Sequence, residues 1–268
     1  MEKASWVPNH GKKARWTCLC VALGFSLGLT GQDQSLANSA GPLRDIARVK
    51  TGIFEYRDSD HGRQVGSGTI TIQRLADSGN LSFIAKADFA EDFSGFHSQR
   101  WEAVTSPELQ PIFARLAFLR GDEVVPVFEL RYESGKATGF IVSHKDSTQG
   151  IKQTVDALLP NGIVDQRIDW AAILASDLET REHIEFNVFD PGTGISRVTA
   201  EIGPSEELRV PAGTFGAFRV DYQMEKPNRT EHYRLFVTRK LPHVMLREDF
   251  PNGVVSELVR ISGPASRH

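Results

Sequence analysis

The stretch from Val210 to Met224 constrains the fold most, because it joins a tight corner to a strictly alternating strand. Pro211 and Gly213 suit a turn, since proline presets φ and glycine adopts backbone angles closed to other residues. The strand behind the corner has an apolar face formed by Phe218, Val220, Tyr222 and Met224, and a second face formed by Ala217, Arg219, Asp221 and Gln223. Such a strand needs an apolar neighbour on one side and water on the other, as in an antiparallel sheet.

From Val49 onward, short apolar runs alternate with turn residues at spacings of about ten residues, a rhythm typical of sandwiches and barrels. Phe93 to Val104 is predicted to be one strand interrupted by Gly95, and no strand is predicted between His144 and Asp165. Between Asp165 and Asp177, apolar residues recur at intervals of three and four, which predicts a helix. We therefore predict a mainly all-β fold: a large curved antiparallel sheet or open β-barrel of about twelve strands with one short helix.

The first 37 residues have the pattern of a cleavable export signal. Basic residues up to Arg15 precede an apolar run from Cys18 to Thr30, and Ser35-Leu36-Ala37 offers small residues to a signal peptidase. An uncleaved membrane anchor is the alternative, but the apolar run is shorter than the ~20 residues that a spanning helix needs. We expect cleavage after Ala37, a periplasmic protein, and no transmembrane segment after removal of the signal.

Four regions follow from this division: the signal peptide (1–37), a flexible lead-in (38–48), a single β-barrel-like domain (49–262) and a tail (263–268). Both cysteines, Cys18 and Cys20, lie in the signal, so the exported chain has no disulfide and no reactive thiol. Without the signal it has 27 basic and 32 acidic residues. This mildly acidic balance argues against nucleic-acid binding.

The sequence has no strong catalytic motif. It lacks the phosphate-binding pattern GxxxxGK, the zinc pattern HExxH and the serine-hydrolase pattern GxSxG, and Gly66-Ser67-Gly68 favours a bulge within a strand. No two histidines of the exported chain have the spacing of metal ligands on a helix. We predict a non-enzymatic protein without a metal or cofactor.

Two charged clusters are candidate sites. The first contains Glu91, Asp92, His97, Arg100 and Glu102, but strand alternation places His97 beside Gln99 and Trp101 and puts Arg100 with Glu102 on the opposite face. The second is a basic run that could meet an anionic polymer or a lipid head group; it consists of Lys226, Arg229, His232, Arg234, Arg239, Lys240 and Arg247. Interleaved acidic residues favour ordinary solvated strand faces for both.

Aromatic residues at inward positions are the better candidates for a ligand cavity. These are Phe83, Phe89, Trp101, Phe186, Phe218, Tyr222 and Tyr233. A barrel of this size has room for a ligand if side chains do not fill it. We therefore expect a carrier for a lipid-like small molecule or an envelope component. The alternatives are an envelope scaffold with a solid barrel and, less favoured, a carboxylate-dependent hydrolase.

The second half of the chain resembles a known family. Val210-Pro211-Ala212-Gly213-Thr214-Phe215, Lys240-Leu241-Pro242 and the closing hairpin with Ser256-Glu257-Leu258 are similar to the bacterial exported family called domain of unknown function 3108. The resemblance is most specific over residues 165–261 and compatible over 49–144. It implies a large, curved antiparallel sheet similar in outline to periplasmic lipoprotein carriers, and it implies no catalytic residues.

The assigned facing of the corner strand is testable by mutation. Phe218→Asp should cost more than ~3 kcal/mol of unfolding free energy, because a buried ring is lost and a carboxylate is placed inside. Arg219→Ala should be nearly neutral. Thermal melts followed by circular dichroism compare the two variants, and equal melting temperatures would contradict the facing.

Overall fold

The computed structural model describes residues 44–93, 95–143 and 150–263. The predicted export signal and most of the lead-in lie outside these ranges. Strands dominate the described part, and all of them belong to one sheet with the order β8-β7-β6-β5-β4-β3-β2-β1-β15-β14-β13-β12-β11-β10-β9. The prediction of a mainly β fold with one short helix is therefore confirmed.

The sheet is a meander in which nearly every strand pairs antiparallel with its neighbour in sequence. The first eight strands are β1 (Gly52–Asp60), β2 (Arg63–Arg74), β3 (Leu81–Phe93), β4 (Phe96–Thr105), β5 (Pro111–Arg120), β6 (Glu123–Glu133), β7 (Lys136–Ser143) and β8 (Ile151–Leu158). The others are β9 (Val164–Asp165), β10 (His183–Asp190), β11 (Gly194–Val210), β12 (Gly213–Lys226), β13 (Arg229–Thr238), β14 (Met245–Asp249) and β15 (Val254–Ser262). Pairing of β1 with β15 joins the two halves of the chain.

The strand count is fifteen where about twelve were predicted, and two elements explain most of the difference. β8 was missed because seven of its eight residues are exposed or half-buried, so no apolar alternation marks it. β9 has only two residues and pairs parallel with β10, which makes the sheet mixed. Gly95 does not interrupt a strand: it has φ +83 and lies in the turn between β3 and β4.

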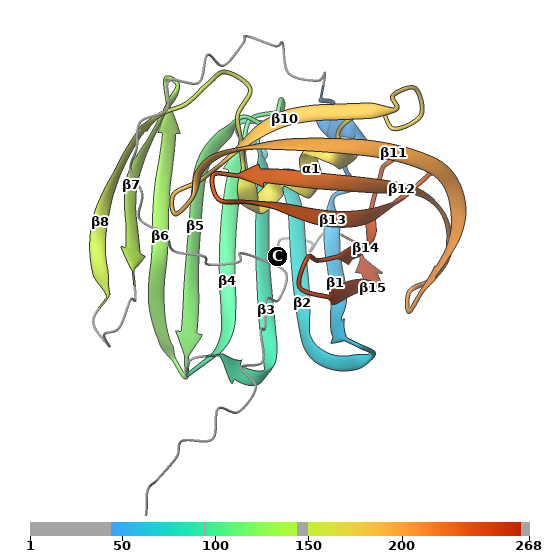
Figure 1. Cartoon of the computed structure of the whole chain (residues 1–268), viewed down its shortest axis with the longest axis horizontal. Helices are drawn as coiled ribbons and strands as arrows, with labels where there is room; N and C mark the ends of the chain where they lie inside the picture. Colours follow the sequence, from blue (N-terminus) through green and yellow to red (C-terminus); the bar gives the residue numbers. More distant parts are fainter. Residues whose placement is uncertain (1–43, 94, 144–149, 264–268) are drawn as a thin grey trace, which may run out of the picture.

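The sheet curls until its two halves face each other. In Figure 1, strands β10–β13 cross in front of the steeper strands β1–β6, and the helix α1 (Asp169–Leu174) lies between the two layers. Register shifts that add a residue to one strand, such as those at Asp58/Ser59 and Ile202/Ser205, support this bending. Two short 3-10 helices, η1 (Ile46–Arg48) and η2 (Gln166–Ile168), complete the described elements.

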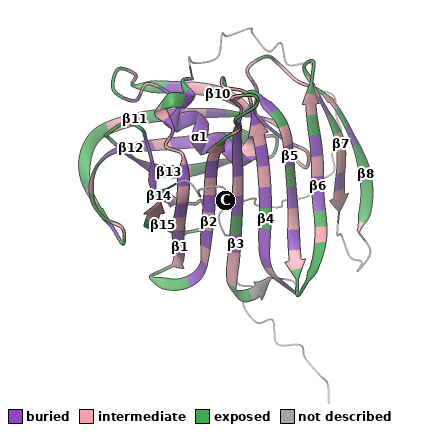
Figure 2. Cartoon of the chain, turned by 180° about the vertical axis from the view of Figure 1, so that it is seen from behind, coloured by how far each residue is buried: buried purple, intermediate pink, exposed green. Residues whose placement is uncertain are grey.

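Side chains of α1 fill the space between the layers. Ala171, Ala172, Ile173 and Leu174 are at most 1% exposed, and the ring of Trp170 meets Phe83 edge-on with centroids 6.0 Å apart. Figure 2 shows the same arrangement, with buried residues over α1 and an alternation of buried and less buried residues along β1–β6. The interior next to α1 is therefore a packed core.

The corner strand β12 has the predicted facing. Phe218, Val220, Tyr222 and Met224 are all buried, whereas Arg219, Asp221 and Gln223 are half-buried. Ala217, predicted on the outer face, is fully buried as well.

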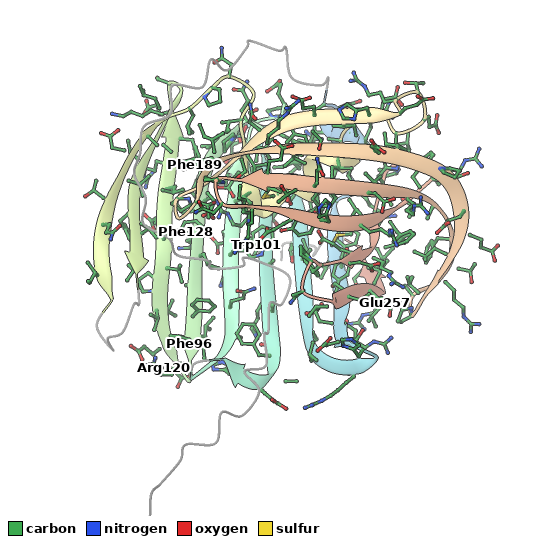
Figure 3. All side chains as sticks on the ribbon, viewed as in Figure 1. Phe96, Trp101, Arg120, Phe128, Phe189 and Glu257 are labelled. Atoms are coloured by element: carbon green, nitrogen blue, oxygen red, sulfur yellow. The ribbon has the colours of Figure 1, made fainter. Side chains whose placement is uncertain are left out.

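A buried arginine holds the two ends of the curl together. The guanidinium of Arg167 donates from Nε to Asp165 (2.5 Å) and from Nη1 to Asp190 (2.5 Å), and it lies 4.5 Å from the ring centroid of Phe128 on β6. The hydroxyl of Tyr132, also on β6, donates to Asp165 (2.5 Å). Figure 3 shows Phe128 and Phe189 close to each other, with Phe96 and Arg120 at the far end of β4 and β5. Side-chain contacts thus connect β9 and β10 to β6, where no backbone pairing connects them.

Arg167→Met should destabilise the protein by about 3–5 kcal/mol, because it leaves two carboxylates buried without their cation. Arg197 is the matched control: it also makes a two-pronged contact, with Glu185, but at the surface. Arg197→Met should cost about 0–1 kcal/mol. Urea unfolding measures both free energies, and a similar loss in the two variants would show that the Arg167 cluster does not hold the fold.

Candidate functional site

The outer face of strands β10–β14, turned away from α1, has a row of charged residues at matching register. His183 lies opposite Glu201, Glu201 opposite Asp221, and Asp221 opposite Arg234. Asp249 on β14 lies opposite Arg234 and ends the row. Directly opposite residues in an antiparallel sheet share a face, so pairing alone brings these five side chains together.

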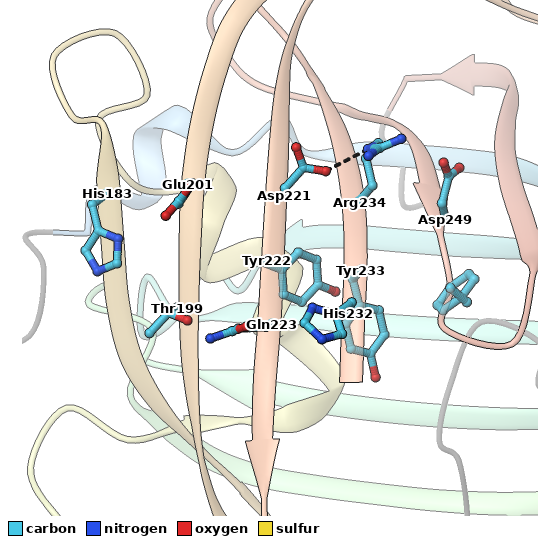
Figure 4. A pocket seen from close by; sticks show the side chains of 11 residues that line it. His183, Thr199, Glu201, Asp221, Tyr222, Gln223, His232, Tyr233, Arg234 and Asp249 are labelled. Carbon is cyan, nitrogen blue, oxygen red and sulfur yellow. Dashed lines mark hydrogen bonds and ion pairs between the residues drawn. The ribbon is translucent and has the colours of Figure 1, made fainter. Parts of the chain in front are cut away.

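A groove of about 560 Å³ follows this row. The groove is lined by His183, Thr199, Glu201, Asp221, Tyr222, Gln223, His232, Tyr233, Arg234, Asp249 and Phe250 (Figure 4). Its volume is in the range of about 300–1,000 Å³ that is usual for small-molecule sites. Charged and amide side chains form its walls, and three aromatic residues contribute to its lining.

Ion pairs fix several of the wall residues. Asp221 accepts from Nε of Arg234 (2.7 Å) and pairs with Nε of Arg219 (3.0 Å). Asp249 accepts from Nε of Arg247 (2.6 Å). His183 and His232 are exposed at the groove, as is Glu201. The walls therefore present hydrogen-bond donors and acceptors of both charges to a bound molecule.

Tyr222 and Tyr233 connect the groove to the interior. Their rings stack with centroids 4.7 Å apart and an interplanar angle of 7°. The Tyr222 hydroxyl donates to Oε1 of Glu248 (2.6 Å), and the Tyr233 hydroxyl donates to Oε2 of Glu231 (2.7 Å). Both acceptors are buried carboxyl groups, so the phenol ends of the two side chains point inward.

The interior behind the two tyrosines holds an unusual set of buried acids. Burial raises the pKa of Asp169 to about 7, and burial together with the nearby Asp169 carboxyl raises the pKa of Glu248 to about 8. Asp58, fully buried on β1, adds to the rise at Glu248. Charged carboxylates are disfavoured here because little water reaches them and the acids repel one another.

Glu231 behaves in the opposite way. Nζ of the buried Lys226 lies 2.6 Å from its Oε2, and Arg229 lies 2.6 Å from its Oε1. Although burial acts to raise the pKa of Glu231, these cations and the Tyr233 hydroxyl lower it. The interior thus contains one acid with a lowered pKa, Glu231, and two acids with pKa values near neutrality, Asp169 and Glu248.

The seven aromatic residues predicted to line a cavity fall into two groups. Tyr222 and Tyr233 line the groove. The other five pack in or against the hydrophobic core, and none of them lines this groove; they are Phe83, Phe89, Trp101, Phe186 and Phe218.

Sequence reasoning missed Asp169, Glu231 and Glu248. The sequence does contain a signal for the two glutamates. Glu248 lies on the same face of its strand as Leu246, and Glu231 lies on the same face as Leu235; both leucines are fully buried. An acid at an apolar position of an alternating strand is the pattern that identifies such groups.

The first charged cluster is an ordinary strand face, whereas the basic run is divided: His232 and Arg234 line the groove, and Lys226 pairs with the buried Glu231. Trp101 and Gln99 are buried, while Arg100 pairs with Glu102 on the other face. Much of the basic run is neutralised: Lys226 and Arg229 contact Glu231, Arg234 contacts Asp221, and Arg247 contacts Asp249.

Within the described ranges, no group of three or more His, Cys, Asp or Glu side chains could hold a metal ion. Nor is any helix of the described residues long and apolar enough to cross a membrane.

Comparison with known proteins gives a family and a fold. The profile of the family described as protein of unknown function DUF3108 matches residues 51–259. No curated protein has a matching sequence. The crystal structure of a β-barrel-like protein of domain of unknown function DUF1849 from Brucella abortus has a TM-score of 0.52 at 9% identity, covering 80% of this chain and 99% of that chain. At this identity the similarity concerns the fold alone.

Two further solved structures are more distant. One, described as exported and YmcC-like in fold, comes from Bacteroides fragilis and has a TM-score of 0.34 at 13% identity, with 83% of this chain and 99% of that chain covered. The other, described as a lipoprotein, comes from Parabacteroides distasonis and has a TM-score of 0.33 at 12% identity, with coverages of 82% and 99%. TM-scores this low carry no argument about the present chain.

Glu248→Gln should stabilise the protein increasingly as pH rises. The folded protein keeps Glu248 protonated up to about pH 8, whereas an unfolded glutamate ionises near pH 4. The contribution of this group to stability is therefore complete below about pH 4 and is lost as pH rises through about 8. Glutamine keeps the Oε1 acceptor for Tyr222 and cannot ionise, so the variant should gain on the order of 4 kcal/mol over wild type between pH 5 and pH 8.

Urea unfolding at the two pH values measures this gain. Asp122→Asn, at an exposed position, is the control and should follow the wild type. A Glu248→Gln variant that differs from wild type equally at both pH values would show that Glu248 is ionised in the folded protein.

Proposed function

The chain belongs to the DUF3108 family of proteins of unknown function, and from this premise we propose that it is an extracytoplasmic, non-enzymatic binding protein that carries a lipid-like amphiphile. The N-terminal pattern of basic residues, an apolar run and Ser35-Leu36-Ala37 supports export. The absence of catalytic motifs from the sequence supports a binding role. A β-barrel-like architecture is compatible with a carrier but does not identify a ligand.

The groove on β10–β14 is the observation that carries this proposal. It combines the half-buried Phe250 with hydrogen-bonding side chains such as Arg234 and His232. Binding sites for small molecules typically pair apolar lining with a few polar groups that fix orientation. An amphiphile matches both parts, because its apolar portion contacts Phe250 while its head group meets the charged walls.

An envelope scaffold is the second candidate, and the packed interior favours it. The helix α1 fills the space between the sheet layers with side chains that are almost completely buried. We therefore do not place the ligand inside the curl of the sheet next to α1. The groove lies on the opposite face of the strands, where a ligand and a solid interior are compatible.

Native mass spectrometry of protein purified from its own host without detergent tests the carrier function. Gln223 lies in the middle of the groove between Thr199 and His232, so Gln223→Trp should fill the groove. Thr214→Trp, exposed on the same strand outside the groove, is the matched control. We expect a co-purifying molecule on the wild type and the control, reduced about tenfold or more on Gln223→Trp, which corresponds to a loss of about 1.4 kcal/mol in binding.

Wild-type protein without a bound molecule would overturn the proposal. Equal retention by both tryptophan variants would also do so, since it would place the ligand elsewhere. A stoichiometric protein partner captured by crosslinking in place of a small molecule would favour the scaffold function.

A further inference from the structure

β8 is a long edge strand at one end of the sheet. Among the strands of the described residues it pairs only with β7, over all eight of its residues and without a register shift. The opposite edge, β9, has two residues, both buried. Proteins usually protect sheet edges by shortening, bulging or covering them, because an unpaired row of backbone N–H and C=O groups invites another strand. β9 is protected in this way, whereas β8 is neither short nor bulged and is covered by no other strand of the described residues (Figure 1). Its charged residues are Lys152 and Asp156.

The side chains of β8 also suit a partner. Ile151 and Leu158 at its two ends are 60% and 82% exposed, among the most exposed large apolar residues of the described chain. Lys152 has no ion pair within the described ranges, and its ammonium lies 3.8 Å from the ring centroid of Phe140. Asp156 contacts Nζ of Lys136 at 2.7 Å and remains largely exposed.

We propose that β8 pairs antiparallel with β8 of a second copy of the chain, about a two-fold axis at Thr154. Antiparallel pairing about a two-fold axis is isologous, so that residue i of one copy faces residue j of the other and j faces i. Directly opposite side chains share a face, which requires the axis to pass through a residue and not between two residues.

Among the registers whose two-fold axis passes through a residue, the charges of Lys152 and Asp156 favour one. With the axis at Thr154, Lys152 faces Asp156 of the second copy, and the contact occurs twice by symmetry. An axis at Gln153 places Lys152 opposite Thr154, and an axis at Val155 places it opposite Leu158. Only the register centred on Thr154 joins opposite charges, and it also places Ile151 against Ala157 on the other face. Like charges would meet if either charged residue were reversed.

The interface consists of one strand pair, so we expect a dimer that dissociates on dilution. Sedimentation velocity over a range of concentrations measures the association of the full chain. Lys152→Asp and Asp156→Lys, each alone, should weaken dimerisation about tenfold or more, because each creates two repulsive contacts. The double variant should restore it. Circular dichroism confirms that each variant remains folded.

A cysteine placed on the axis reports the register directly. In a chain with Cys18→Ser and Cys20→Ser, Thr154→Cys brings two thiols together at a Cα separation of about 4.5–5.5 Å, which a disulfide can span. Lys152→Cys is the matched control, because its two copies lie four residues apart, about 13 Å along the strands. Mild oxidation should crosslink only the first variant.

A protein that is monomeric at all concentrations would overturn the proposal, as would a dimer whose affinity the single charge reversals leave unchanged. Failure of the double variant to regain affinity would exclude the Lys152–Asp156 contact. Crosslinking of both cysteine variants, or of neither, would exclude the axis at Thr154.

Discussion

The buried ion cluster around Arg167 is the interaction on which the shape of this protein depends. A meander of antiparallel strands that curls without closing needs something other than backbone pairing to hold its ends. Arg167 supplies it, since its guanidinium contacts Asp165 and Asp190 beside one end of the sheet and the Phe128 ring near the other. Burial of a charge is costly, but every carboxylate in the cluster has a partner, and Tyr132 adds a further donor to Asp165. The contact with β6 leaves β7 and β8 beyond the point of closure, so that β8 ends the sheet among the described strands.

The second buried cluster has a different character. Asp169 and Glu248 lie near one another, neither forms an ion pair with a cation of the described residues, and burial raises the pKa of both toward neutrality. Asp169 and Glu248 lower the stability of the folded protein when they are ionised, so packing alone does not explain why they lie behind the groove. Tyr222 and Tyr233 line the groove and donate to buried carboxyl groups on the inner side of the same strands. Tyr222 therefore links the groove to Glu248, an acid with a pKa near neutrality, whereas Tyr233 links it to Glu231, an acid with a lowered pKa.

Particular elements show where sequence reasoning succeeded. The facing of Phe218 to Met224 was predicted correctly because alternation with a period of two is a local property of a half-buried strand. The helix was placed correctly within residues 165–177, although only Asp169–Leu174 is α-helical. β8 was missed because both of its faces are largely exposed, so that its residues carry no alternation to detect. The groove was missed for a related reason: its walls come from five strands, and only the register between them assembles the row from His183 to Asp249.

By itself, the sequence determined the class of fold, the short helix and the inner face of the corner strand, because periodicity and turn chemistry act over a few neighbouring residues. It also determined the resemblance to the family to which the chain belongs. Only the tertiary structure decided that the interior beside α1 is filled, that the groove lies on the outer face, and that Asp169 and Glu248 lie near each other in the core. Each of these depends on how far the sheet curls and which distant strands the curl brings together, and such long-range contacts leave no trace in local pattern.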